Sequence, residues 1–324
     1  MVHKIWLQIE PHPKVFEFLK GRAEIIGPFV RPSEGDLLSE VEDADAVLAG
    51  TEFPATRETM QRAVRLKAIC RFGIGYDTVD VEAATELGIC VTNTPDAPTI
   101  AVSEFTFGLM INVTRKIRLA DRLIRDGGWL SPSLSGTDLH GKTLGLIGMG
   151  RIGSRVAKIA HAFEMHVVVF DPYLDAARAR EAGVDLVSDL SGLLRRSDIV
   201  SVHVPLTAET EGMLGAAEFA AMKKGSILLN VSRGPIVRED DLYEALAGGH
   251  IAGAGIDVWS EEPPDPDNPL LALDNIVAAP HAAGMTIEGR GRSNPAAARQ
   301  ALQVLDGERP KDLVNPEVWE KRRR

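Results

Sequence analysis

Short apolar segments alternate with helix-like segments along almost the whole chain. Predicted strands in the first hundred residues lie at 4–9, 46–49, 67–70 and 89–92, with helices between them at 56–64 and 81–87. A second set of strands is predicted at 143–147, 167–170, 199–204, 226–230, 251–256 and 276–279, with helices at 152–163, 174–182, 188–195 and 239–247. Strands that alternate with helices in this way form parallel sheets with crossover helices. We therefore expect an α/β protein with two doubly wound parallel-sheet domains.

A proline-punctuated connector at residues 93–98 separates the two sets of strands. A single long helix is predicted from about 99 to 125, because apolar residues recur three and four positions apart before Gly127 and Gly128. That much apolar surface predicts burial against another domain or another subunit. A last helix is predicted at 295–305, and we expect the chain after Gly284 to return to the first domain, which makes that domain discontinuous.

The overall charge narrows the class of protein. The 324 residues carry a formal net charge of −10, and an acidic protein repels phosphate backbones, so we expect no nucleic-acid partner.

The N-terminal segment lacks the apolar core of a signal peptide, and no apolar run is long enough for a membrane span, so a cytoplasmic protein without a membrane partner is expected.

The two cysteines and the basic C-terminal run are interpreted as structural features rather than functional sites. Cys70 and Cys90 each end an apolar run, which indicates buried reduced thiols rather than a disulfide or a metal pair, and we expect no metal site. The only basic run, residues 321–324, we interpret as a solvated tail.

A glycine fingerprint opens the second set of strands. The segment Gly148-Met149-Gly150-Arg151-Ile152-Gly153 follows a predicted strand and precedes a predicted helix, the context that a dinucleotide site requires. We expect Gly148 to make a tight turn, Gly150 to let a pyrophosphate approach and Gly153 to let helix and strand pack closely. Asp171 ends the next strand, 23 residues after Gly148, where a carboxylate accepts from ribose hydroxyls and repels a 2′-phosphate. The pattern therefore predicts NAD rather than NADP.

Three polar side chains follow strands in the second half of the chain. Arg233 follows the strand at 226–230, Glu262 the strand at 251–256 and His281 the strand at 276–279. Ligands of open parallel sheets bind beyond the carboxyl ends of the strands. Arginine suits a carboxylate, and a histidine held by a carboxylate can exchange a proton with a carbonyl or hydroxyl oxygen. Singly, each is open to another interpretation: a surface arginine, a solvated acidic loop or a turn histidine.

Further motifs accompany these residues in a fixed order. They are Gly73-Ile74-Gly75-Tyr76-Asp77, Asn93-Thr94-Pro95, Gly141-Lys142-Thr143-Leu144-Gly145, His203-Val204-Pro205-Leu206-Thr207, Asn230-Val231-Ser232-Arg233-Gly234, Gly255-Ile256-Asp257-Val258 and Pro280-His281. With the glycine fingerprint, this set resembles the D-isomer-specific 2-hydroxyacid dehydrogenase family over nearly the whole chain.

The resemblance implies a Rossmann-type NAD-binding domain at 99–286 and a flavodoxin-like, discontinuous substrate domain at 1–98 and 287–324. It implies that Arg233 binds the substrate carboxylate, that His281 binds substrate as the acid/base and that Glu262 is the partner of His281. Amides near Ile74 and Gly75 are implied to help hold the substrate. The implied cofactor-binding residues are Gly148, Gly150, Arg151, Ile152, Gly153, Asp171, His203, Pro205, Thr210, Val231, Ser232, Asp257 and Gly284. Asp257 is implied to lie near the nicotinamide carboxamide, and a homodimer built on the cofactor domain is implied as well.

The expected reaction is hydride transfer between NAD and a small 2-oxo acid or its (R)-2-hydroxy acid. Glyoxylate, hydroxypyruvate, pyruvate and larger 2-oxo acids remain alternatives. Phosphoglycerate is a further one, because Arg71 resembles an arginine of phosphoglycerate dehydrogenases, although the loop at 49–52 lacks the basic residues that those enzymes tend to carry. A function of another class is a non-enzymatic NADH-sensing protein, like the transcriptional corepressors in this family.

Overall fold

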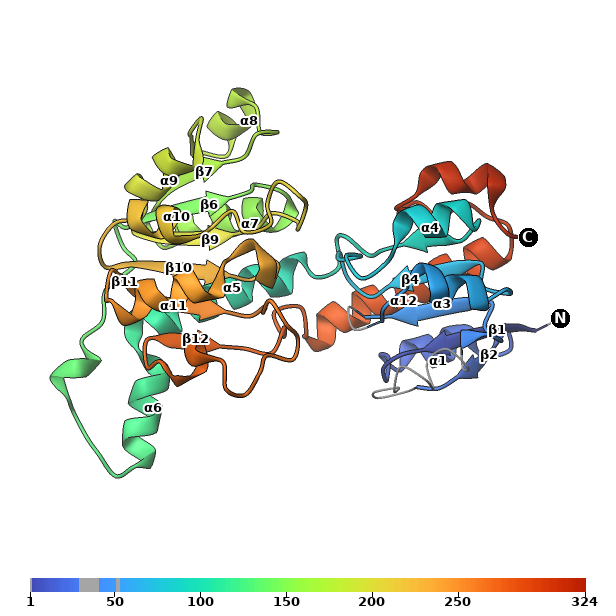
Figure 1. Cartoon of the computed structure of the whole chain (residues 1–324), viewed down its shortest axis with the longest axis horizontal. Coiled ribbons are helices and arrows are strands. Elements are labelled where there is room, and N and C mark those ends of the chain that lie inside the picture. The colour runs from blue at the N-terminus through green and yellow to red at the C-terminus, as the bar shows by residue number, and fades with distance from the viewer. Residues whose placement is uncertain (1, 29–40, 51–52) are drawn as a thin grey trace. The chain divides into compact units, whose positions relative to one another are not determined.

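The computed structural model describes residues 2–28, 41–50 and 53–324, and the chain forms two compact units. The first unit comprises residues 1–98 and 284–324, and the second comprises residues 99–283. Each unit is built on one parallel sheet with helices on both faces, as Figure 1 shows. The predicted fold class, two doubly wound α/β domains, is therefore confirmed.

The first unit contains a five-stranded sheet in the order β2-β1-β3-β4-β5, the flavodoxin-like order. Its strands are β1 (His3–Leu7), β2 (Ala23–Ile26), β3 (Ala46–Ala49), β4 (Ala68–Arg71) and β5 (Cys90–Thr92). Alternate strand residues face opposite cores. One core packs against α3 (Arg57–Arg62) and α4 (Val81–Glu86), and the other against α1 (Lys14–Leu19) and α12 (Ile287–Leu305). The half-buried edge strand β2 was not predicted, because its four residues carry too short an apolar signal.

The second unit contains a seven-stranded sheet in the order β12-β11-β10-β9-β6-β7-β8. Its strands are β6 (Thr143–Ile147), β7 (His166–Phe170), β8 (Asp185–Leu186), β9 (Ile199–Val202), β10 (Ser226–Asn230), β11 (Ile251–Ile256) and β12 (Ile276–Ala278). One face packs against α5 (Thr99–Arg115), α7 (Arg151–Ala162) and α8 (Ala176–Glu181), the other against α9 (Leu190–Arg196), α10 (Ala216–Ala221) and α11 (Glu239–Ala247). The strand order reverses between β6 and β9, the switch point at which such sheets bind ligands.

The predicted helix at 99–125 is wrong as a single element. It is divided into α5 and α6 (Ile117–Arg125) at Lys116, whose φ of 54° places it in the left-handed region. The Asn112 side chain accepts from the amide of Arg118 at 3.0 Å and so begins the second helix. No side chain of α6 is buried, and Figure 1 shows this helix extending away from the sheet of its unit. Apolar periodicity continues across the junction and therefore did not reveal the break.

The last long helix begins at Ile287, eight residues before the predicted start at Pro295. The side chain of Thr286 accepts from the amide of Gly289 at 2.8 Å and caps the helix, while Pro295 lies inside it. Proline is typical of a first helical turn, so its presence suggested a start that the structure places earlier. Among the described residues, no helix combines the length and the apolar character needed to cross a bilayer.

The basic C-terminal run is not a solvated tail, so that interpretation is wrong. The guanidinium of Arg323 donates to the carbonyls of Leu87 at 2.8 Å, Ala63 at 2.7 Å and Leu66 at 3.0 Å. Leu87 and Ala63 are the C-cap residues of α4 and α3, where carbonyls lack partners within the helix, and Leu66 lies in the loop between α3 and β4. The prediction for the two cysteines is confirmed, since both Cys70 and Cys90 are free and buried.

Candidate active site

The glycine loop joins β6 to α7 with little room on one side and open space on the other. A Cβ at Gly148, which has a φ of 93°, would lie 2.8 Å from the carbonyl oxygen of His203. A Cβ at Gly153 would lie 2.3 Å from the carbonyl oxygen of Gly148, so helix and loop touch there. A Cβ at Gly150, the N-cap of α7, would meet no atom within 4 Å. This open side, facing the first amides of a twelve-residue helix, fits the pyrophosphate of a dinucleotide.

Asp171 follows β7 and is tied to the glycine loop. One carboxylate oxygen accepts from the amide of Met149 at 2.8 Å, and the other accepts from the amide of Tyr173 at 2.8 Å. A carboxylate oxygen can accept more than one hydrogen bond, so Asp171 keeps capacity for ribose hydroxyls. The acceptor is thus fixed relative to the loop that would hold the phosphates.

The segment after β9 forms a compact turn beside the switch point. The ring of His203 shares a 2.8 Å hydrogen bond with the Ser201 hydroxyl, and burial lowers the pKa of His203 to about 3. The imidazole of His203 is therefore neutral at pH 7. The hydroxyl of Thr210 donates to the carbonyl of Pro205 at 2.7 Å and closes the turn.

The segment after β10 is fixed to the turn after β9. Val231 is buried, and the hydroxyl of Ser232 donates to the carbonyl of Val204. The Asn230 side chain both accepts from the amide of Ser232 at 3.1 Å and donates to the carbonyl of Arg233 at 2.9 Å. The backbone that carries Arg233 is thus held on both sides.

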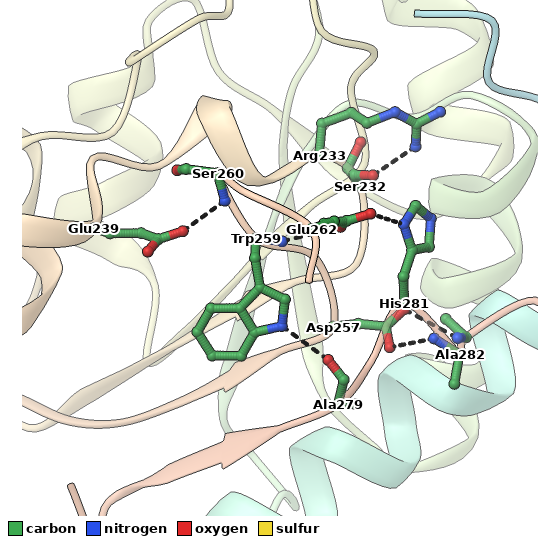
Figure 2. Close-up of polar contacts among 11 residues, drawn as sticks. Ser232, Arg233, Glu239, Asp257, Trp259, Ser260, Glu262, Ala279, His281 and Ala282 are labelled. Carbon is green, nitrogen blue, oxygen red and sulfur yellow. Dashed lines mark hydrogen bonds and ion pairs between the residues drawn. The ribbon is translucent and has the colours of Figure 1, made fainter. Parts of the chain in front are cut away.

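His281 and Glu262 form a close pair of side chains at the carboxyl edge of this sheet. Nδ1 of His281 lies 2.7 Å from a carboxylate oxygen of Glu262, whose other oxygen accepts from the amide of Trp259 at 3.1 Å. Figure 2 shows the guanidinium of Arg233 beside this pair, with one nitrogen donating to the carbonyl of Ser232 at 2.6 Å. Burial acts to raise the pKa of Glu262, but the hydrogen bond and charge of His281, with a contribution from Arg233, leave it below its usual value. The three residues that the sequence singled out in the second unit therefore lie together.

Asp257 shapes the turn that presents His281. Its fully buried carboxylate accepts from the amides of Ala282 at 2.8 Å and Ala283 at 2.9 Å, and its carbonyl accepts from the amide of His281 at 2.7 Å (Figure 2). His281 adopts a φ of 52°, which a histidine rarely adopts without such support. Burial raises the pKa of Asp257. These contacts give Asp257 a structural task that the sequence did not indicate.

Gly234 brings the arginine and the glutamate segments together. A Cβ at this position would lie 1.9 Å from the carbonyl carbon and oxygen of Trp259. The indole of Trp259 in turn donates to the carbonyl of Ala279 at 3.0 Å, next to the histidine turn (Figure 2). The sequence did not predict either contact. Nothing in it indicates that a glycine after one strand packs against a tryptophan after another.

The comparisons with known proteins agree with this geometry. Residues 107–283 match the model of the D-isomer specific 2-hydroxyacid dehydrogenase, NAD binding domain. A glyoxylate reductase from Korarchaeum cryptofilum is 42% identical over 89% of this chain and 87% of its own. The chain belongs to this family.

Two other relatives show how far the likeness extends. A D-3-phosphoglycerate dehydrogenase from Methanocaldococcus jannaschii is 44% identical over 86% of this chain, but only 53% of that protein is covered. The chain thus spans about half the length of the phosphoglycerate dehydrogenases that it matches. The structure of a D-lactate dehydrogenase from Aquifex aeolicus, complexed with NAD and lactic acid, aligns with a TM-score of 0.86 at 28% identity, over 97% of this chain and 99% of the other.

The remaining residues that the family resemblance implied lie elsewhere in the two units. Arg151 and Ile152 begin α7 directly after the open glycine. Ile74 and Gly75 lie in the loop after β4 of the first unit, and Gly284 is the first residue of the returning segment of that unit. Part of the loop compared with phosphoglycerate dehydrogenases, residues 51–52, lies outside the described residues. In the part of the chain that the structure describes, no group of three or more histidine, cysteine or acidic side chains could hold a metal ion.

Proposed function

We propose that the protein is an NAD-dependent oxidoreductase that interconverts a small 2-oxo acid and its (R)-2-hydroxy acid. The observation that carries the proposal is the 2.7 Å pair of His281 and Glu262, with Arg233 beside it, on the sheet that also bears the glycine loop. When bound, NAD exchanges a hydride with carbon 2 of the substrate.

The three side chains have separate tasks in this proposal. Arg233 binds the substrate carboxylate, for which a planar guanidinium offers two parallel donors. Glu262 accepts from Nδ1 of His281, which fixes the ring orientation and leaves Nε2 for the substrate. His281 then donates a proton to the carbonyl oxygen during reduction and removes it from the hydroxyl during oxidation. The depressed pKa of Glu262 keeps its carboxylate ionised throughout.

The cofactor-binding residues follow the ends of adjacent strands. Gly148, Gly150 and Gly153, with the first amides of α7 at Arg151 and Ile152, would hold the pyrophosphate. Asp171 would accept from the adenine ribose. The turn containing His203, Pro205 and Thr210 would line the adenine side, while Val231, Ser232, Asp257 and Gly284 would lie toward the nicotinamide. The open side of Gly150 and the anchored Asp171 support this arrangement.

A homodimer built on the second unit completes the proposal. Four large apolar side chains of α6 and the segment after it are exposed: Ile117 by 47%, Ile124 by 55%, Trp129 by 76% and Leu130 by 87%. Contiguous exposed apolar side chains are typical of subunit contacts. Light scattering should give twice the mass of the chain, and Trp129→Ser with Leu130→Ser should shift it toward the monomer. A wild-type monomer at micromolar concentration would exclude the dimer.

The proposal also covers the location of the protein in the cell and its partners. The net charge of −10 and the small-molecule chemistry of the site support a protein that works in the cytoplasm without nucleic-acid or membrane partners. Fluorescence microscopy of a tagged full chain tests the location.

The decisive experiment measures NADH oxidation against glyoxylate, hydroxypyruvate, pyruvate, phosphohydroxypyruvate and larger 2-oxo acids, with NADPH in parallel. Turnover of at least one acid with NADH, and slower turnover with NADPH, is the expected result. Tight NADH binding without turnover of any acid would instead support the sensing function. The acid with the highest kcat/KM identifies the substrate class. One methylene more or less in the acid changes the free energy of discrimination between two substrates by only about 1–3 kcal/mol.

A further inference from the structure

The Glu262 loop, residues 260–268, is held by hydrogen bonds rather than by burial. Every residue from 260 to 267 except Pro264 is exposed, so packing does not fix the position of Glu262. Its carboxylate nevertheless lies 2.7 Å from Nδ1 of His281. An exposed loop with few packed side chains moves unless hydrogen bonds restrain it. The bonds that restrain the Glu262 loop therefore decide how well the glutamate stays on the histidine.

The carboxylate of Glu239, the first residue of α11, binds both ends of the Glu262 loop. One oxygen accepts from the amide of Ser260 at 2.6 Å (Figure 2). The other oxygen accepts from the side chain of Asn268 at 2.7 Å. Asn268 is itself fixed, because its side-chain oxygen accepts from the amide of Leu270 at 3.0 Å. A single half-buried carboxylate thus joins the residues before and after Glu262 to a helix of the second unit.

Trp259 connects the start of this loop to the segment that carries His281. Its amide donates to the Glu262 carboxylate at 3.1 Å. Its buried indole donates to the carbonyl of Ala279 at 3.0 Å, and Ala279 and Pro280 directly precede His281 (Figure 2). One residue therefore contacts both members of the pair or their immediate backbone. A phenylalanine ring has no N–H donor and cannot make the bond to Ala279.

We infer that Glu239 and Trp259 are positioning residues that keep the carboxylate of Glu262 on Nδ1 of His281. Each acts through Glu262 rather than on the substrate. The inference rests on the proposed function, in which His281 exchanges a proton through Nε2 while Glu262 orients its ring. It extends the proton-transfer machinery to α11, a helix that carries none of the proposed catalytic or cofactor-binding residues.

The inference predicts slower chemistry with unaltered binding. The backbone of Arg233 is held by the side chain of Asn230, and Asp171 is bound to the glycine loop, so neither depends on the Glu262 loop. KM for the best 2-oxo acid and the Kd for NADH should therefore stay within about twofold of the wild type. We expect Glu239→Gln and Trp259→Phe to slow hydride transfer in a single turnover about tenfold, because misplacing a catalytic group by about 1 Å costs up to about 10²-fold.

Each variant has a matched control. Glutamine has the shape of glutamate, but its NH2 group replaces one of the two acceptors that serve Ser260 and Asn268. Asp240→Asn removes a charge from the same first turn of α11 at an exposed side chain, and its rate should match the wild type. Trp319→Phe makes the tryptophan replacement in the first unit and should also leave the rate unchanged. If Trp259→Phe does not fold, as circular dichroism will reveal, the glutamine variant decides.

A double-mutant cycle separates positioning from general support of the fold. A residue that acts through Glu262 loses its effect once Glu262 has been replaced. We expect Glu239→Gln to slow hydride transfer by less than about twofold in a Glu262→Gln background, against about tenfold in the wild type. The same factor in both backgrounds overturns the inference. A wild-type rate in both Glu239→Gln and Trp259→Phe overturns it as well.

The tautomer of His281 tests the inference without turnover. Glu262 accepts from Nδ1, so the neutral ring carries its proton there, and a displaced Glu262 leaves the proton free to occupy Nε2. Nitrogen-15 NMR of protein labelled at its eight histidines, at about pH 9, reports this ratio, and His281→Gln assigns the signals. The Nδ1–H fraction should fall in Glu239→Gln and in Trp259→Phe, and it should stay unchanged in Asp240→Asn.

The two readouts together separate this inference from the proposed function. If the wild type turns over no 2-oxo acid but the tautomer of His281 shifts in both variants, the proposed function fails and the positioning role stands. If the wild type turns over an acid but neither the rate nor the tautomer changes in the variants, the positioning role alone fails. If the wild type shows no turnover and the tautomer does not shift, both fail.

Discussion

The imidazole of His281 is the group on which proton transfer depends in the proposed reaction. Replacing it with glutamine keeps a polar side chain of similar reach but removes the acid/base. We expect His281→Gln to lower kcat about 10²–10⁴-fold, because positioned proton transfer contributes about that much. The NADH Kd should stay near the wild-type value, which shows that the cofactor site is intact. A variant that retains more than a tenth of wild-type kcat would remove His281 from the mechanism.

The carboxylate of Glu262 makes a pH-dependent contribution to stability. Its pKa is lowered in the folded protein, so its stabilising effect is fully present above the ordinary glutamate pKa and is lost as the pH falls through the folded value. We therefore expect the gap in unfolding free energy between wild type and Glu262→Gln to be largest above about pH 5 and to narrow below about pH 4. Urea denaturation at several pH values measures it. A gap that widens with acidification contradicts the sign.

Asp171 bears on the choice between NAD and NADP. Its carboxylate would repel a 2′-phosphate, so Asp171→Ser should raise the ratio of kcat/KM for NADPH over NADH by about tenfold or more. The serine also loses one anchor of the glycine loop, and both cofactors should bind less tightly. The ratio is therefore the informative quantity. If it stays constant while both affinities fall, Asp171 is only a loop anchor.

At the scale of elements, close backbone approach decides how the active residues meet. Gly234→Ala would place a methyl group within 1.9 Å of the Trp259 carbonyl group, so the arginine and glutamate segments must separate. We expect a loss of about 1–3 kcal/mol in unfolding free energy. We also expect a lower kcat/KM for the 2-oxo acid. Gly108→Ala, in α5, is the control, since a Cβ there meets no atom within 4 Å and alanine favours a helix. Equal behaviour of the two variants would refute the role of Gly234.

The sequence predicted strands best where most of their residues are buried. Strands β3, β6, β10 and β11 have the predicted bounds, because continuous apolar runs mark them on both sides. The edge strands β2 and β8, which have no buried residue, carry no such run and were missed. The break at Lys116 and the early start of α12 depend on single side-chain caps, Asn112 and Thr286, which periodicity does not register.

The candidate site was predictable only in part, for a related reason. His281, Glu262 and Arg233 are chemically distinctive and follow strands, so topology brings their positions to one sheet edge. The carboxylate of Asp257 bonds to two amides beyond His281, and the carboxylate of Glu239 bonds to the amide of Ser260. Such side-chain bonds to the backbone depend on the path of the chain in three dimensions, which no spacing in the sequence reveals.

At the scale of the whole molecule, Arg323 ties the C-terminal segment to the N-terminal part of the first unit. Arg323→Ala removes the donor from the carbonyls of Leu87, Ala63 and Leu66, and we expect the first unit to lose about 2 kcal/mol of stability, the range for hydrogen bonds to charged groups. Thermal unfolding measures this loss. The exposed Arg324→Ala serves as the control. If the two variants have the same midpoint of thermal unfolding, the segment is a solvated tail that adds no stability.

The discontinuity of the first unit has a consequence for the order of events on the ribosome. A nascent chain that has reached residue 283 contains every strand of the second unit, but it lacks α12, which covers one face of the sheet in the first unit. Domains generally fold as units during synthesis, so the inserted second unit completes its fold while the earlier segment still exposes the apolar face of its sheet. The first part of the chain to be made is thus the last to become native, and this interval is when the protein most needs a chaperone.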